Sequence, residues 1–371
     1  MRIISLINQK GGVGKTTSTV NLGAAFCRMG HRVLLIDMDP QANLTLHCDV
    51  HGVERSIYDT LVSDTSLADV VVSTELAENL DLAPSNIDLS AAESELASLP
   101  GRERRLRNAL EIFVRELGTG RPKPGPQKKA AEEKAAEAAR EPAPEEKPKE
   151  LSAEMNGATQ ANHQDSAPKA LATGPTSNGV RGDAPKQDEP SGTDAASKAQ
   201  DTPASENAAT DEDAPPTGRL HDEKSPYDFV LIDCPPSLGL LSINALAASH
   251  EVLIPLQMEF FALQGMARLM EVLKLMRRRL NPELRVGGII PCMYDGRTNL
   301  SQEVLNEVRE YFGELVFKTR IRENIRLAEA PSHGRAIFDY SPSSNGAQDY
   351  LALAQEVLTL LEARQPKAAT N

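Results

Sequence analysis

The sequence contains no tryptophan and few other aromatic residues, with 8 Phe and 6 Tyr among 371 residues. Its 4 cysteines lie outside any Cys-x-x-Cys pair and have no metal-ligand spacing, so they predict free thiols in a reducing compartment. No apolar run reaches the roughly 18 residues that a membrane span needs. No signal peptide precedes the first predicted strand, at residue 2. We therefore expect a cytoplasmic protein without a membrane partner.

The shortage of aromatic residues is most pronounced in one segment. Residues 118–226 contain no Phe, Tyr, Trp or Ile, whereas 14 of the 25 prolines fall there. Such a composition buries too little apolar surface to offset the entropy lost on ordering. We predict a single domain formed by residues 1–117 and 227–371, with a disordered, low-complexity insertion at 118–226. The roughly 260 residues that remain are enough for one doubly wound α/β core.

The formal charge of −13 provides no general attraction to nucleic acid. The insertion accounts for −6 of it, because it has 14 basic and 20 acidic residues. From residue 251 to the end, 15 basic and 15 acidic residues cancel. Any contact with DNA must therefore come from a local basic cluster.

The segment at residues 8–17 reads Asn-Gln-Lys-Gly-Gly-Val-Gly-Lys-Thr-Thr, between an apolar strand at 2–7 and a helix that runs to Met29. Glycines allow backbone conformations in which successive N–H groups point at one anion, and the helix N-terminus adds further donors. We therefore predict a phosphate-binding loop for ATP. The residues expected to hold the nucleotide are Lys10, Gly11, Gly12, Val13, Gly14, Lys15, Thr16 and Thr17.

Within this loop Lys15 is placed to bridge the β- and γ-phosphates and Thr16 to hold Mg²⁺. Two other strands end in carboxylates. The apolar run 32–37 leads into Asp37 and Asp39, and the run 227–233 ends at Asp233. Parallel sheets bind ligands at the carboxyl ends of their strands. Asp233 therefore fits the Walker B position, where a carboxylate accepts hydrogen bonds from waters on Mg²⁺.

The remaining pattern predicts alternating strands and helices, hence a mostly parallel sheet with helices on both faces. Further strands are expected at 80–83, 251–256, 285–291 and 316–321, and helices at 57–62, 90–99, 103–117, 261–280, 301–312 and 348–363. Apart from the strand at 80–83, residues 43–117 are expected to be helical. The loops after Pro291 and Ile321 are expected to contribute to the adenine pocket.

The run Lys-Gly-Gly-x-Gly-Lys-Thr resembles the deviant Walker A motif of the ParA/MinD group of P-loop ATPases. Residues 295–299 and 324–334 are similar to the chromosome-partition, or Soj-like, ParA branch, and the resemblance covers the chain outside 118–226. It implies that Lys10 reaches across an ATP-dependent homodimer to the other subunit's phosphates. It also implies that Asp39 activates the attacking water for hydrolysis, with Asp37 supporting the metal shell.

The same resemblance implies a cycle in which the ATP dimer binds nonspecific double-stranded DNA through Arg297 and Arg326 and associates with the nucleoid. A ParB-type centromere-binding protein would then stimulate a weak ATPase. The residues themselves show a basic cluster after residue 316, made of Lys318, Arg320, Arg322, Arg326 and Arg335. One departure affects this region, because the family usually has Pro-Arg where this chain has Arg322 and Glu323.

Other classes remain as alternatives. A MinD-like ATPase acting at the membrane usually ends in a basic, bulky amphipathic helix, whereas this chain has Glu356 and Glu362 and no aromatic residue after Tyr350. A related tyrosine kinase would carry a tyrosine-rich tail, and a nitrogenase-reductase-like carrier would need cluster cysteines, for which Cys234 is the one candidate. A purely structural DNA-coating protein leaves the strand-end aspartates unexplained. A self-repressing plasmid ParA would have an upstream helix-turn-helix domain.

Overall fold

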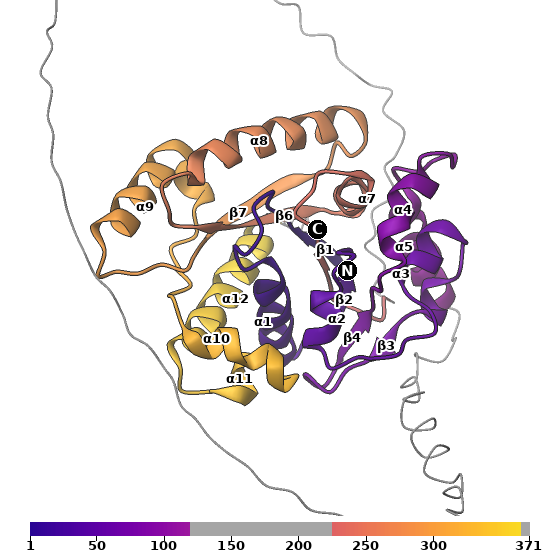
Figure 1. Ribbon diagram of the computed structural model, residues 1–371, viewed down its shortest axis with the longest axis horizontal. Coiled ribbons are helices and arrows are strands. Elements are labelled where there is room, and N and C mark those ends of the chain that lie inside the picture. Colours follow the sequence, from indigo (N-terminus) through magenta and orange to yellow (C-terminus); the bar gives the residue numbers. More distant parts are fainter. Residues whose placement is uncertain (119–224, 365–371) are drawn as a thin grey trace, which may run out of the picture. The chain divides into compact units, whose positions relative to one another are not determined.

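The computed structural model describes residues 1–118 and 225–364 (Figure 1). Its centre is a seven-stranded sheet with the order β3-β4-β2-β5-β1-β6-β7, in which β3 alone runs antiparallel to its neighbour. The strands are β1 (Arg2–Leu6), β2 (Val33–Asp37), β3 (Val72–Ser73), β4 (Leu80–Ala83), β5 (Phe229–Asp233), β6 (Glu251–Gln257) and β7 (Arg285–Cys292). The predicted doubly wound, mostly parallel sheet is confirmed.

Helices cover both faces of this sheet (Figure 1). One face carries α1 (Lys15–Arg28), α2 (Asn43–His47), α10 (Ile325–Glu329), α11 (Ile337–Tyr340) and α12 (Asn345–Ala363). The other face carries α3 (Ile57–Val62), α4 (Leu89–Leu96), α5 (Arg105–Gly118), α7 (Leu240–Ala248), α8 (Ala262–Arg279) and α9 (Asn299–Phe312).

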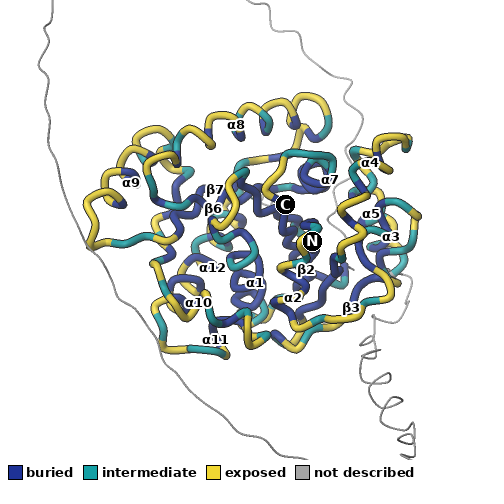
Figure 2. The backbone as a smooth tube through the Cα atoms, in the orientation of Figure 1, coloured by how far each residue is buried: buried dark blue, intermediate teal, exposed yellow. Residues whose placement is uncertain are grey.

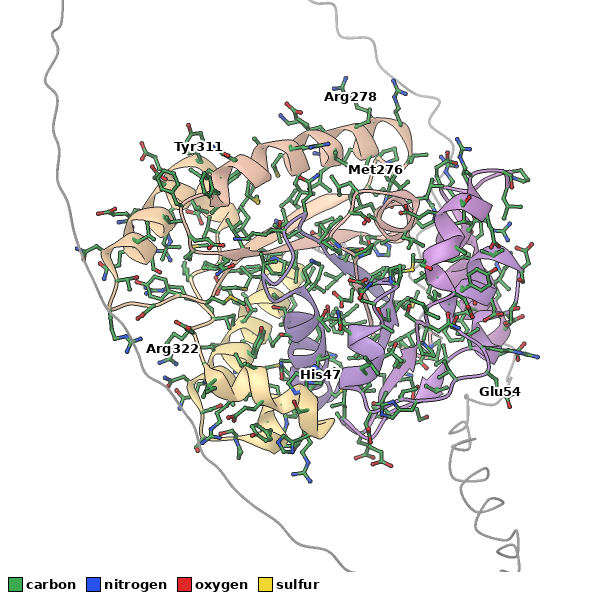
Figure 3. All side chains as sticks on the ribbon, viewed as in Figure 1. His47, Glu54, Met276, Arg278, Tyr311 and Arg322 are labelled. Carbon is green, nitrogen blue, oxygen red and sulfur yellow. The ribbon has the colours of Figure 1, made fainter. Side chains whose placement is uncertain are left out.

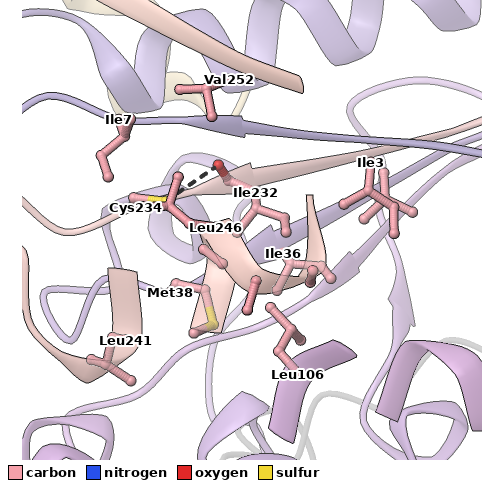
Figure 4. Close-up of a cluster of buried hydrophobic side chains, with 14 of the residues drawn as sticks. Ile3, Ile7, Ile36, Met38, Leu106, Ile232, Cys234, Leu241, Leu246 and Val252 are labelled. Atoms are coloured by element: carbon pink, nitrogen blue, oxygen red, sulfur yellow. Dashed lines mark hydrogen bonds between the residues drawn. The ribbon is translucent and has the colours of Figure 1, made fainter. Parts of the chain in front are cut away.

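Alternate residues of the strands divide the core into two layers. Ile3 and Ile36 belong to the layer under α5 and α7, whereas Ile4 and Leu35 belong to the layer under α1 and α12. This alternation follows from the twofold side-chain period of a strand. Figure 4 shows the first layer around Ile3, Ile36 and Ile232. In Figure 2 the strands and α1 are mostly dark blue, which is expected when both faces of a parallel sheet are covered.

The predicted strand at 316–321 is wrong. Single bridges join Val316 to Ile289 and Arg322 to Tyr294, but no strand forms between them. The backbone N–H groups of Lys318 and Thr319 donate instead to the carboxylate of Glu356 on α12, at 2.8 and 2.9 Å. A side-chain acceptor therefore interrupts the ladder beside β7.

Several short elements were not predicted. The segment 43–117 has the two-residue edge strand β3 beside the expected β4. Helix α7 is apolar on nearly all sides because it is buried, so it has no helical stripe to read in the sequence.

The predicted insertion, 118–226, lies almost wholly outside the described residues. Of the helices at 1–118 and 225–364, none combines the length and hydropathy that a bilayer span requires.

Candidate nucleotide site

The sheet register brings the predicted site residues to one edge. Asp37 at the end of β2 pairs with Asp233 at the end of β5, and Asp233 also pairs with Leu6 at the end of β1. The loop at 8–14 begins directly after β1 and leads into α1. The phosphate-binding loop and both strand-end aspartates therefore lie together at the carboxyl edge, as predicted.

The loop has the backbone that its glycines predict. Gly12 and Gly14 have φ values of +75° and +89°, which L side chains rarely adopt, and an added Cβ at Gly12 would meet open space. Asn8 braces the loop, since its side chain donates to the Pro255 carbonyl at 2.7 Å and accepts from the Lys10 N–H at 3.0 Å. The backbone is thus held open toward solvent.

Lys15 is buried at the first turn of α1, where its ammonium donates to the Lys10 carbonyl at 3.3 Å. Burial lowers the pKa of Lys15, and the negative charge of Asp233 opposes that shift. An ammonium folded back over its own loop is placed to meet the phosphates that this loop would hold.

Thr16 and Asp233 form the arrangement expected of a magnesium site. The Thr16 hydroxyl donates to Asp233 Oδ2 at 2.6 Å. The second oxygen, Oδ1, is buried and accepts no hydrogen bond from a described residue. Hydroxyl and carboxylate oxygens are the ligands that Mg²⁺ prefers, and Mg²⁺ commonly uses few protein ligands together with phosphates and waters. The residues present therefore fit the ion.

The two carboxylates after β2 differ in their surroundings. Asp37 is fully buried, and its Oδ2 accepts from the N–H and the hydroxyl of Thr45 at 2.9 and 2.7 Å. Asp39 accepts through Oδ1 from the Gln41 N–H at 3.0 Å, while its Oδ2 makes no hydrogen bond to a described residue. Thr45 thus fixes the orientation of the Asp37 carboxylate, whereas Asp39 has one oxygen without a hydrogen-bond partner among the described residues.

We expect the melting temperature of the nucleotide-free protein to decrease as the pH rises from 5 to 8. Burial, and then the charge of Asp37, raises the pKa of Asp233 to about 8, and burial raises the pKa of Asp37 to about 6. In the unfolded chain both carboxyls titrate at roughly pH 4. Between pH 5 and pH 8 the native state therefore binds more protons than the unfolded state. The free energy of unfolding consequently decreases as the pH rises. Scanning calorimetry of wild type and Asp233→Asn tests this. An equally steep decline in the variant would contradict the assignment.

A cavity of 410 Å³ adjoins the phosphate-binding loop. Its walls come from the start of α1, from the end of β7, and from the segment that leads into α10. The lining includes Gly14, Thr17, Cys292, Met293, Ile321 and Tyr350. It lies at the loops after Pro291 and Ile321 that the sequence indicated.

Lys10 points away from its own loop. Its ammonium forms an ion pair with Glu259, in the turn between β6 and α8, and about half of the Lys10 side chain is exposed. The second lysine of the motif therefore differs from Lys15, which is buried against the loop.

The two arginines predicted to bind DNA are both exposed: Arg297 lies in the loop before α9, and Arg326 lies on the first turn of α10. Arg297 forms a two-point ion pair with Asp295, both contacts at 2.9 Å, and Arg326 pairs with Glu329 at 2.8 Å. The Arg297 side chain is 87% exposed. Both guanidinium groups are accessible, although each has an acidic neighbour.

Within the predicted basic cluster, Arg322 is paired with an acidic residue of a distant helix. Its guanidinium makes bonds of 2.7 to 3.1 Å with Asp349 on α12. Arg320 lies over the ring of Tyr294 at 4.7 Å. The departure at Arg322 and Glu323 thus leaves Arg322 bracing α12, and the cluster is smaller than its sequence indicates.

Some site residues were not predicted. Thr45 clamps Asp37, Ser85 donates to the Asp39 carbonyl at 2.8 Å, and the Tyr350 hydroxyl lies 3.0 Å from that of Ser18 on α1. None of the three stands in a motif. A buried hydroxyl far away in the sequence carries no local signal.

The fold and the loop together define a P-loop nucleotide-binding protein. A family model described as "AAA domain" matches residues 1–116 and 213–286. The sporulation initiation inhibitor protein Soj of Bacillus subtilis is 36% identical over 358 residues, covering 96% of this chain and 98% of that protein. The chromosome partitioning protein ParA of Caulobacter vibrioides is 33% identical over 371 residues, covering 100% and 98%. The chain belongs to the ParA-type P-loop ATPases, with the chromosome-partitioning proteins Soj and ParA.

Solved structures show the same fold at lower identity. Cobyrinic acid a,c-diamide synthase from Mycobacterium smegmatis, with a bound ATP analog and magnesium, has a TM-score of 0.60 at 24% identity and covers 98% of this chain and 97% of its own. The septum site-determining protein MinD from Pyrococcus horikoshii, complexed with Mg-ADP, has a TM-score of 0.56 at 22% identity and covers 98% of both chains.

Proposed function

We propose that this protein is a partitioning ATPase whose ATP-bound dimer binds DNA without sequence preference. The observation that carries the proposal is the group formed by Lys15, Thr16 and Asp233 at the end of a glycine loop. Lys15 and the loop N–H groups would hold the phosphates, and the cavity beside Gly14 would take the adenosine. The unsatisfied Asp233 Oδ1 and the Thr16 hydroxyl would hold Mg²⁺, which screens the phosphate charge.

Dimerisation would depend on the γ-phosphate. Each subunit presents Lys10, Lys15 and the backbone of the glycine loop at the same edge. Two such edges repel each other unless enough negative charge lies between them. The triphosphate would supply that charge, and its hydrolysis beside Asp39 would separate the subunits.

The comparisons favour chromosome partitioning over positioning at the membrane. The full-length relatives include Soj and several ParA chromosome partitioning proteins. In addition, the apolar face of the C-terminal helix α12 is occupied, because Tyr350, Leu353 and Val357 are buried in the core. The exposed side of this helix carries one large apolar side chain, Leu351, among polar and small residues. A ParB-type protein is accordingly the proposed activator.

We expect Arg297→Glu with Arg326→Glu to abolish most DNA binding by the ATP-bound protein. These exposed side chains would contact phosphates, and each lost phosphate contact lowers the slope of log K against log salt by about 1. Fluorescence anisotropy with unrelated duplexes at several salt concentrations measures the effect. Arg277→Glu with Arg278→Glu is the matched control, since it changes the charge by the same amount on α8, where both residues are exposed and Arg278 projects outward (Figure 3). Equal losses in the double variant and the control would contradict the proposed surface.

A further inference from the structure

The turn between β6 and α8 places two aromatic side chains in solvent. Phe260 and Phe261 are 76% and 65% exposed, and their ring centroids lie 5.1 Å apart in an edge-to-face contact. The chain has only 8 phenylalanines, and Phe26 and Phe113 are fully buried. Two adjacent exposed rings make a small apolar patch, and exposed apolar patches are candidates for interaction sites.

This turn is held in place and lies beside the phosphate-binding loop. The Met258 N–H donates to the Cys292 carbonyl at 3.3 Å, and the Ala262 N–H donates to the Glu259 carbonyl at 2.9 Å. Strands β1 and β6 are neighbours, so the segments that follow them share one edge of the sheet. The ion pair between Lys10 and Glu259 joins the two segments directly. The rings are therefore part of the same edge as the nucleotide site.

We propose that a second copy of this chain covers Phe260 and Phe261 when ATP is bound, so that the two rings form an apolar contact of the dimer. The inference rests on the proposed ATP-dependent dimer. A twofold interface uses the same patch on both subunits and must therefore be self-complementary. The two rings meet that condition, because an exposed apolar surface can pack against a copy of itself.

The Lys10–Glu259 pair also explains why the contact would form only with nucleotide. In the structure Glu259 holds Lys10 on its own subunit. A γ-phosphate on the second copy offers Lys10 a more highly charged partner, and the exchange brings the neighbouring rings together. Aromatic residues at the centre of an interface commonly contribute most of its affinity. The γ-phosphate would thus determine when the dimer forms, and the rings would contribute to its affinity.

The absence of tryptophan allows a direct test. In Phe260→Trp the single indole reports its own burial. We expect a blue shift of its emission with a non-hydrolysable ATP mimic, increasing with protein concentration, and none with ADP. Tyr311→Trp is the control, because Tyr311 is 77% exposed but lies on α9 (Figure 3). A concentration-independent shift, or a shift on adding anionic vesicles without nucleotide, would overturn the inference.

A second variant measures how much the two rings contribute to the affinity of the dimer. Phe260→Ser with Phe261→Ser should raise the dimer Kd by about tenfold or more, since the pair would be a hot spot. Binding of a fluorescent ATP analogue per chain should stay within about twofold, and Tyr311→Ser should dimerise like wild type. Sedimentation velocity with the ATP mimic separates the outcomes. A wild-type chain that stays monomeric refutes the proposed dimer itself, whereas a wild-type dimer matched by the double serine variant refutes only the role of the rings.

Discussion

Asp39→Ala is expected to reduce ATP turnover by about a hundredfold or more while leaving ATP binding in place, which is the scale of a lost general base. The carboxylate lies two residues after the end of β2, and its Oδ2 makes no hydrogen bond to a described residue. It is therefore placed to accept a proton from a water at the γ-phosphate. A steady-state phosphate-release assay, with equilibrium binding of a fluorescent ATP analogue, measures both quantities.

The isosteric variant Asp39→Asn sharpens this test. Asparagine keeps the acceptor for the Gln41 N–H but cannot take up a proton. Turnover should fall as far as in Asp39→Ala, and the unhydrolysed ATP should leave the protein as a long-lived dimer. Turnover near the wild-type rate in Asp39→Asn would show that this carboxylate only orients the loop.

Lys10→Ala is expected to prevent ATP-dependent dimerisation without preventing ATP binding. The Lys10 ammonium extends toward Glu259 rather than over its own loop, so its loss removes no contact that the subunit makes to its own phosphates. Truncating one member of a desolvated charge pair costs about 2–5 kcal/mol, which raises a dimer Kd by about thirtyfold or more. Sedimentation velocity with a non-hydrolysable ATP mimic measures the shift.

Two comparisons isolate the role of Lys10. Lys15→Ala should lose nucleotide binding itself, because that ammonium is buried against the loop. Glu259→Gln breaks the same ion pair from the other side but keeps the lysine, so dimerisation with ATP should persist. If Lys10→Ala still dimerised as wild type does, or if Glu259→Gln failed in the same way, the lysine would act through Glu259 and not across the interface.

The positions of the predicted nucleotide-site residues at one edge of the sheet could be expected from the sequence because each part is local. Glycines at 12 and 14 adopt the positive φ values that only their side-chain-free backbone favours, and Lys15 and Thr16 follow them on the first turn of α1. Asp37 and Asp233 end strands whose apolar runs are evident in the sequence. Each of these features depends on residues within one element and its adjoining loop.

The basic surface could be predicted less well. Arg322 was grouped with its neighbours by sequence, but its guanidinium pairs with Asp349, 27 residues further along. The predicted strand at 316–321 does not form, because the N–H groups of Lys318 and Thr319 donate to the Glu356 carboxylate on α12. A hydrogen-bonding group takes the partner that packing brings near, and sequence spacing contains no information on partners so remote.

The glycine loop and the strand-end carboxylates can be recognised in the sequence, because each depends on a few consecutive residues. The contacts that these groups make depend on the packing of distant segments. The tertiary structure turned Lys10 toward Glu259, left one oxygen of Asp39 open, clamped Asp37 with Thr45, and exposed Phe260 and Phe261 beside the loop. These contacts depend on which strands become neighbours in the sheet, and the order of the strands depends on the packing of the whole core.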